Sequence, residues 1–133
     1  MRTLSKTASK TLNTLTTKMK PGQVRRIGEK GGAFMQVIVE RLTEDRYSVT
    51  HYYEQAGDLC PDPDVEFYRF ETGAWIPVCI RQYAGYRQAV DFDAEGKPSC
   101  FYPRTLRELC SFTTTWMKNI RAQQDLKNLP AAC

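Results

Sequence analysis

Residues 46–55 read RYSVTHYYEQ, and their side chains alternate in character along the stretch. Alternate positions are largely apolar, namely Tyr47, Val49, His51 and Tyr53. The positions between them are more polar, namely Arg46, Ser48, Thr50 and Tyr52. Because successive side chains of a strand point to opposite faces, this pattern predicts a strand with one buried and one wet face.

Further extended runs lie on both sides of this stretch. They are AFMQVIVERL (33–42), VEFYRFE (65–71), WIPVCIRQY (75–83) and YRQAVDFD (86–93). Short connections between most of these runs favour an antiparallel meander of about five strands. The segment AGDLCPDPD (56–64) contains two prolines and predicts a loop, because proline lacks the ladder donor.

Both ends of the chain carry helical patterns. Near the C-terminus the apolar residues recur at steps typical of a buried helical stripe over residues 104–126, namely Leu106, Leu109, Cys110, Thr113, Trp116, Met117 and Ile120. Thr105 and Glu108 match a capping box at the start of this helix. A similar stripe at the N-terminus predicts an amphipathic helix that ends at Pro21-Gly22, and it comprises Met1, Leu4, Ala8, Leu12, Leu15 and Met19.

These elements predict an α+β fold. An antiparallel sheet of about five strands is packed by a C-terminal helix, and an N-terminal amphipathic helix precedes it. At 133 residues the chain has the size of one ordinary domain. We expect a basic amphipathic helix with a Gly-rich connector over 1–31, a single α+β domain over 32–128 and a tail over 129–133.

Composition argues against several protein classes. No apolar run approaches the roughly 20 residues of a membrane span, and the first 20 residues lack the apolar region of a secretory signal. We therefore expect a cytoplasmic protein. The five cysteines have no CxxC spacing, which favours reduced thiols over a zinc site. No sequence motif indicates a cofactor.

The charge of the chain is unevenly distributed. Residues 1–31 hold eight lysines and arginines and one acid, whereas residues 32–133 carry a formal charge of −3. A basic segment beside an acidic body is typical of proteins with an anionic partner, either nucleic acid or an acidic protein face, although a merely solvated N-terminus has the same pattern. The candidate partner-binding residues are these bases and two strand aromatics, namely Lys6, Lys10, Lys18, Lys20, Arg25, Arg26, Tyr52 and Tyr68.

Evidence for catalysis is weaker. Asp62, Asp64 and Glu66 share one side of an extended chain and could hold a divalent ion, which gives a metal-dependent hydrolase as one alternative. Acids beside a strand more commonly protect an edge. The single histidine, His51, lies on the apolar side of its strand, where a core role is more common than a catalytic one. We expect no catalytic residue, no bound metal and no enzymatic activity.

Three stretches carry a resemblance to a known family: HYYEQAGDLCPDPDVEF (51–67), WIPVCIRQYAGYRQAV (75–90) and LRELCSFTTTWMKNIRAQ (106–123). The HYxxQxGDLxxDP core and the Phe, Trp and Asn of the last helix resemble an uncharacterised bacterial family, a domain of unknown function in small proteins of mobile genetic elements of Firmicutes. The resemblance covers residues 35–125 and leaves the basic N-terminus outside. It implies an accessory protein of a mobile element with no established activity.

The core of this motif also has a structural interpretation. Its polar residues can bond the backbone of a Gly-Pro loop and fix the direction in which the chain leaves it. The loop-motif residues are His51, Gln55, Gly57, Asp58 and Asp62.

Together these features favour a non-catalytic binding module that occupies a host protein or nucleoprotein surface, for example as an inhibitor of a defence system such as a CRISPR effector. The alternative is a nucleic-acid-binding accessory protein that uses the basic N-terminal segment. The sequence does not indicate the oligomeric state.

Overall fold

The structure is a computed structural model that describes residues 2–29 and 31–133, with the backbone alone for residues 53–55 and 59. In this part of the chain the helices are α1 (Lys6–Leu15) and α2 (Pro103–Gln123). The strands are β1 (Val24–Ile27), β2 (Val37–Arg41), β3 (Arg46–Gln55), β4 (Asp58–Arg69), β5 (Trp75–Gln82), β6 (Gly85–Gln88), β7 (Val90–Phe92) and β8 (Pro98–Phe101).

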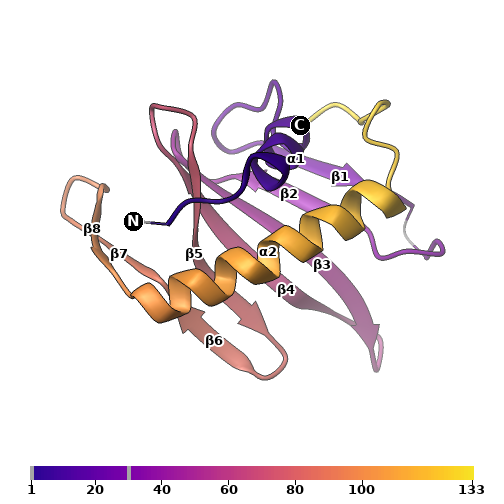
Figure 1. The fold of residues 1–133 in the computed structure, drawn as a ribbon. Helices are drawn as coiled ribbons and strands as arrows, with labels where there is room; N and C mark the ends of the chain where they lie inside the picture. The colour runs from indigo at the N-terminus through magenta and orange to yellow at the C-terminus, as the bar shows by residue number, and fades with distance from the viewer. Residues whose placement is uncertain (1, 30) are drawn as a thin grey trace.

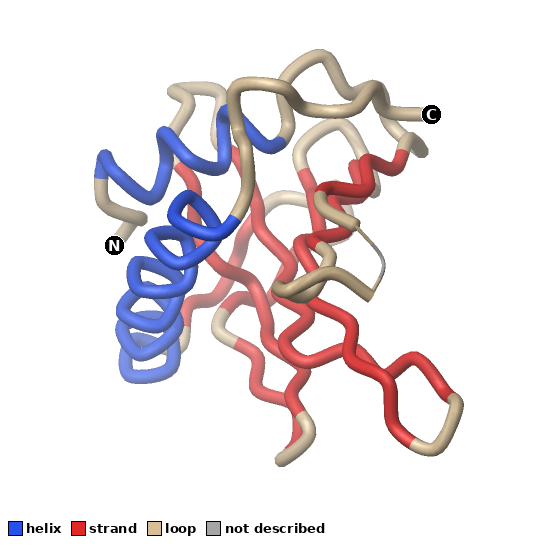
Figure 2. Tube along the Cα trace, turned by 90° about the vertical axis from the view of Figure 1, so that its right-hand side faces the viewer, coloured by secondary structure: helices blue, strands red, loops and turns tan. Residues whose placement is uncertain are grey.

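Strands β1 to β6 form one antiparallel sheet in the order of the sequence, and β7 pairs with β8 in a separate hairpin. The helix α2 crosses one face of the sheet and α1 lies beside it (Figure 1). Figure 2 shows both helices on the same side of the strands. The predicted α+β fold, with an antiparallel sheet packed by a C-terminal helix, is confirmed. No described helix is long and apolar enough to cross a membrane.

The described residues form more strands than the sequence predicts, which is about five. β1 lies inside the segment 22–31, which the sequence predicts as a flexible connector, and it pairs with β2 from Val24 to Ile27. The run predicted over 86–93 divides into β6 and β7, because the chain leaves the large sheet at Ala89 and turns into the small hairpin. The predicted turn EGKPS leads into β8 rather than directly into the helix.

The predicted loop over residues 56–64 is wrong. The turn between β3 and β4 consists of Ala56 and Gly57, whose φ angles are +52° and +87°, and β4 begins at Asp58. Two successive positive φ angles are typical of the tight turns that join twisted strands. The prolines of this stretch are tolerated because β5 pairs with β4 only from Asp64 onward, so residues 58–63 have a ladder on one side alone.

The predicted buried face of α2 is confirmed, but its predicted capping box is wrong. All seven residues of its apolar stripe are buried. The helix begins at Pro103, where a missing N–H costs nothing, and its N-cap Tyr102 makes no side-chain cap bond. Glu108 instead pairs with Arg87 and Arg104, so its carboxylate is not available to cap the first turn.

The N-terminal helix belongs to the same hydrophobic core as the sheet and α2. Ser5 caps α1 by accepting the N–H of Ala8, and Leu12 and Leu15 are fully buried. Trp75 Nε1 donates to Asn13 Oδ1 at 2.9 Å, which ties α1 to β5. Arg121 Nε donates to Thr11 Oγ1 at 3.1 Å, which ties α2 to α1. The basic segment 1–31 therefore contributes a helix and a strand to the fold.

His51 lies in the core between β3 and α2. Trp116 Nε1 donates to His51 Nδ1 at 3.2 Å, and the two rings meet edge to face. Since Nδ1 accepts a hydrogen bond, the proton of the neutral ring sits on Nε2. Within the described residues, His51 Nε2 and Thr113 Oγ1 have no hydrogen-bond partner. The core role predicted for His51 agrees with this placement.

Burial lowers the pKa of His51 below its ordinary value. Between the ordinary value of about 6.5 and the lower folded value, the unfolded chain binds a proton that the folded protein does not. We therefore expect the free energy of unfolding to fall below pH 6.5, by up to about 1.4 kcal/mol per pH unit. Urea melts between pH 7.5 and 5.5 measure this slope.

The matched control is His51→Gln, which removes the titrating group and keeps an acceptor for Trp116. Its melts should vary less with pH than those of the parent protein across the same interval. A parent and a variant with the same pH slope would contradict a neutral, buried His51.

Candidate functional site

The two helices and the lead into α1 form a strongly basic layer. Residues 2–20 and α2 together carry nine lysines and arginines and the single acid Glu108, a formal charge of +8, while the rest of the chain carries −4. All nine bases are exposed, and they are Arg2, Lys6, Lys10, Lys18, Lys20, Arg104, Arg107, Lys118 and Arg121. We call this set the basic face.

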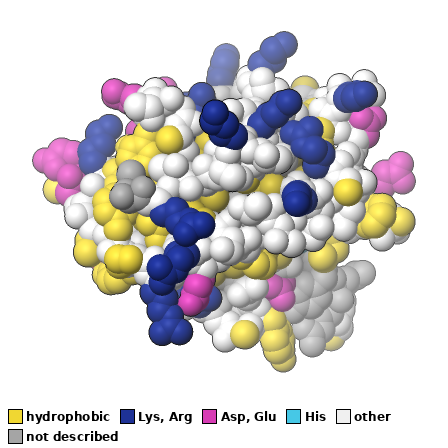
Figure 3. All heavy atoms as spheres, viewed as in Figure 1, with side chains coloured by type: hydrophobic (Ala, Val, Ile, Leu, Met, Phe, Trp, Pro, Cys, Tyr) yellow, Lys and Arg dark blue, Asp and Glu magenta, His cyan; other side chains and the backbone are white. Residues whose placement is uncertain are grey.

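Packing explains why these charges lie on one side. Each helix turns its apolar stripe toward the sheet, so its lysines and arginines point away from it. Figure 3 shows Lys and Arg side chains spread over both helices, with most of the visible acids toward the margins. The only acid of the layer is occupied, because Glu108 accepts from Arg87 and Arg104, and this pairing lowers its pKa. The basic face therefore presents little negative charge to repel an anion.

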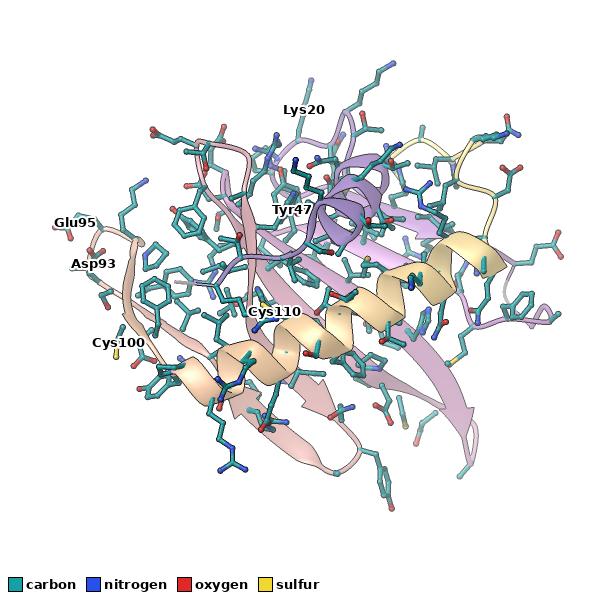
Figure 4. The ribbon with its side chains drawn as sticks, in the orientation of Figure 1. Lys20, Tyr47, Asp93, Glu95, Cys100 and Cys110 are labelled. Atoms are coloured by element: carbon teal, nitrogen blue, oxygen red, sulfur yellow. The ribbon has the colours of Figure 1, made fainter. Side chains whose placement is uncertain are left out.

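Lys6, Lys10, Lys18 and Lys20 are exposed on the basic face, as their prediction as partner-binding residues requires. In Figure 4, Lys20 lies at the α1 end of the molecule, far from the β7–β8 hairpin that carries Asp93 and Glu95. Arg26 is exposed, but it alternates with the buried Arg25 and Ile27 along β1 and therefore belongs to the opposite side of the sheet.

Arg25 and Tyr68 differ from their prediction as partner-binding residues. Arg25 is 4% exposed, and its guanidinium donates to three backbone carbonyls: Leu15 O at 2.7 Å, Thr17 O at 2.8 Å and Pro130 O at 2.8 Å. Tyr68 is 4% exposed and packs on Phe70 and Phe92. Both side chains make their contacts within the protein. Tyr52 is half-buried on the polar side of β3.

Of the loop-motif residues, Gln55, Gly57 and Asp58 lie at the β3–β4 turn, whereas His51 lies further back in β3, in the core. Gly57 supplies a positive φ in the turn, and Asp58 opens β4 opposite Gln55, whose side chain lies outside the described residues. Asp62 is half-buried within β4. The two-residue turn takes the place of the loop that these residues were predicted to shape, so the motif belongs to the sheet.

The sheet surface away from the helices is polar and partly buried. Thr50 Oγ1 donates to Asp64 Oδ1 at 3.1 Å, and Glu66 pairs with Arg46. Burial raises the pKa of the Asp64 carboxyl and of the Cys79 thiol. A thiol held protonated is a poorer nucleophile than a thiolate.

Asp64 and Glu66 lie on this polar surface at alternate positions of β4. The expectation that Asp62 shares their side is wrong, because the register shifts between Thr50 and Tyr52 and the regular alternation along β4 breaks between Pro61 and Asp64. Glu66 pairs with Arg46, and Asp64 accepts from Thr50. Among the side chains that the structure describes, no group of three His, Cys, Asp or Glu is placed to hold a metal ion.

Sequence reasoning missed four of the nine residues of the basic face, those on α2. They lie between the apolar residues of α2, far along the chain from the basic segment 1–31, and are Arg104, Arg107, Lys118 and Arg121. The sequence predicts that these four side chains lie on the outer side of the helix. It does not predict that they lie beside α1, because that depends on how the two helices pack. The bonds of Arg25 to distant carbonyls had no signal in the sequence.

The chain belongs to the family described as a domain of unknown function, DUF6908, whose model matches residues 6–126. The match begins at the first residue of α1, so the prediction that the basic N-terminus lies outside the family is wrong. This agrees with the burial of α1 in the common core. No curated protein and no solved structure matches the chain.

Replacing Arg25 with Met should destabilise the protein strongly. Three carbonyls, two of them at the end of α1, lose their donor; that of Leu15 is buried and the other two are partly buried. Each loss at a buried group costs about 1–3 kcal/mol, and the cavity left by the buried guanidinium adds to it. We expect a loss of at least about 3 kcal/mol in the free energy of unfolding, measured by denaturant melts.

Arg26→Met is the matched control, because Arg26 is the adjacent residue of β1 and is exposed. It should change stability by less than about 0.5 kcal/mol, as surface substitutions usually do. Equal effects of the two substitutions would contradict the structural role of Arg25.

Proposed function

We propose that this protein is a non-catalytic binding module that engages the phosphates of nucleic acid through its basic face. The observation that supports this most directly is the gathering of nine exposed lysines and arginines, with one occupied acid, over two neighbouring helices and the residues that flank α1. Sequence-independent binding to nucleic acid rests on such contacts between basic side chains and phosphates.

Two features of the face favour a long polyanion over a small ion. The bases are distributed along both helices rather than converging on one point (Figure 3). Exposed lysines and arginines also pair with phosphates at little desolvation cost, and each pairing releases a condensed counterion. The sugar-phosphate backbone of a nucleic acid has regularly spaced charges and can therefore contact many of these bases at once.

A second candidate is a protein or nucleoprotein of a host, bound by an accessory protein of a bacterial mobile element that counters a defence system. Its support is the exposed aromatic group at the β5–β6 edge, where Tyr83 is 80% exposed and Tyr86 is 50% exposed. Tyrosines are common anchors of protein interfaces. This surface lies on the sheet edge, apart from the basic face, so separate substitutions distinguish the two candidates.

If the basic face contacts phosphates, the affinity for duplex DNA should fall steeply with salt. Four contacts give a slope of about −3.6 in log K against log salt, which lowers affinity roughly a hundredfold between 50 and 200 mM. Fluorescence anisotropy with a labelled duplex measures the slope. The double variant Lys6→Gln, Lys10→Gln should weaken binding and reduce the slope by about 1.8 if both lysines contact phosphates.

The matched control is Arg26→Gln, Lys97→Gln, which removes the same charge from outside the helical layer. It should leave the slope unchanged. Absence of binding to duplex and single-stranded DNA at 50 mM salt, or an equal loss in the two double variants, would contradict the proposal.

A further inference from the structure

A hollow of about 460 Å³ lies between the end of α1 and the segment that follows α2. Its cationic side chains are Lys18, Lys20, Arg25 and Lys127, and no Asp or Glu lines it. It is also lined by apolar residues of the C-terminal segment, namely Leu126, Leu129, Pro130, Ala131 and Ala132. The lining thus combines positive charge with apolar surface, and Lys127 lies in the same segment as the apolar residues.

The charge of Arg25 strengthens the positive potential of this hollow. Its guanidinium is buried and donates only to neutral carbonyls, and within the described residues no carboxylate pairs with it. The carbonyls at the end of α1 offset this charge only in part, because a helix terminus carries about half an elementary charge. An anion in the hollow would compensate the remainder.

The three lysines can reach such an anion directly. Lys18, Lys20 and Lys127 are exposed, and none of them forms an ion pair within the described residues. Asp125 is the acid nearest to Lys127 in the sequence, but its carboxylate is already bonded within its own turn. It accepts from Asn128 Nδ2 and from the backbone N–H of Lys127, and these bonds lower its pKa. Gln23 Oε1 accepts the N–H of Lys20, so its amide nitrogen stays available to donate.

We propose that this hollow binds the phosphate monoester at the end of a nucleic-acid strand, with the phosphate against the lysines and the terminal sugar and base against Leu126 and Leu129. The proposal rests on the proposed function and deepens it. A monoester carries almost two charges, more than an internal phosphodiester, and therefore suits a site with three ammonium groups and a buried guanidinium. The volume falls within the usual range of small-ligand sites.

The test compares three single-stranded oligonucleotides by fluorescence anisotropy with the full chain. One carries phosphates at both ends, the second has the same sequence with hydroxyl ends, and the third has hydroxyl ends but four more nucleotides, which at least matches the charge of the first. We expect the phosphorylated strand to bind at least tenfold more tightly than either of the others.

The triple variant Lys18→Asn, Lys20→Gln, Lys127→Gln should abolish this preference. Asn suits position 18 because its φ is +58°, and all three side chains are exposed, so thermal melts should show a folded protein. The matched control Lys6→Gln, Lys10→Gln, Lys118→Gln removes the same charge from the basic face outside the hollow. It should weaken binding of all three strands and keep the tenfold ratio.

Two outcomes separate this inference from the proposed function. Equal affinity for the phosphorylated strand and the longer hydroxyl-ended strand overturns the hollow as a terminal-phosphate site and leaves the basic face intact. If no oligonucleotide binds, the proposed function fails, and titration with adenosine 5′-monophosphate then tests the hollow alone. Binding of adenosine 5′-monophosphate to the parent protein but not to the triple variant supports a phosphate-monoester site. Absence of its binding to the parent protein overturns the site.

Discussion

Burial of two apolar helix stripes against one face of the sheet is the interaction on which the other features depend. Leu12 and Leu15 of α1 and Met117 and Ile120 of α2 are almost completely inaccessible to water, and burial of each such side chain contributes roughly 1.5–3 kcal/mol. The same packing orients the remaining side chains of each helix. Since lysines and arginines occupy the outer positions, both helices add to one basic face, and the protein separates its charges between a positive helical layer and a negative remainder.

Arg25 connects this packing to the proposed binding site. It lies in β1 at the edge of the sheet, yet its bonds hold the end of α1 and the segment after α2 together. The C-terminal segment is further held by the bonds that Val24 and Cys133 exchange at 2.9 and 3.0 Å. One buried guanidinium therefore fixes the shape of the hollow and also contributes to its positive charge.

Much of the fold follows from periodicity in the sequence, and the exceptions have physical causes. The alternation of residues 46–55 and the stripe ending at Ile120 identify β3 and α2 because local pattern and burial agree there. The prolines of β4 gave the wrong prediction of a loop over residues 56–64, because a strand segment that is paired on one side alone tolerates proline and a central strand does not. Of the candidate binding residues, the lysines of the first twenty positions are exposed, whereas Arg25 and Tyr68 are buried through contacts with residues far away in the sequence.

The most direct test of this account is the stability of a variant that lacks residues 1–20, measured by urea unfolding monitored through tryptophan fluorescence. Removal of α1 exposes the sheet face beneath it and deletes five buried core residues, namely Leu4, Ala8, Leu12, Leu15 and Met19. We expect the truncated variant to lose the cooperative unfolding transition. A variant that unfolds cooperatively at the midpoint of the full chain would contradict it, because the basic segment would then be a free arm and not part of the fold.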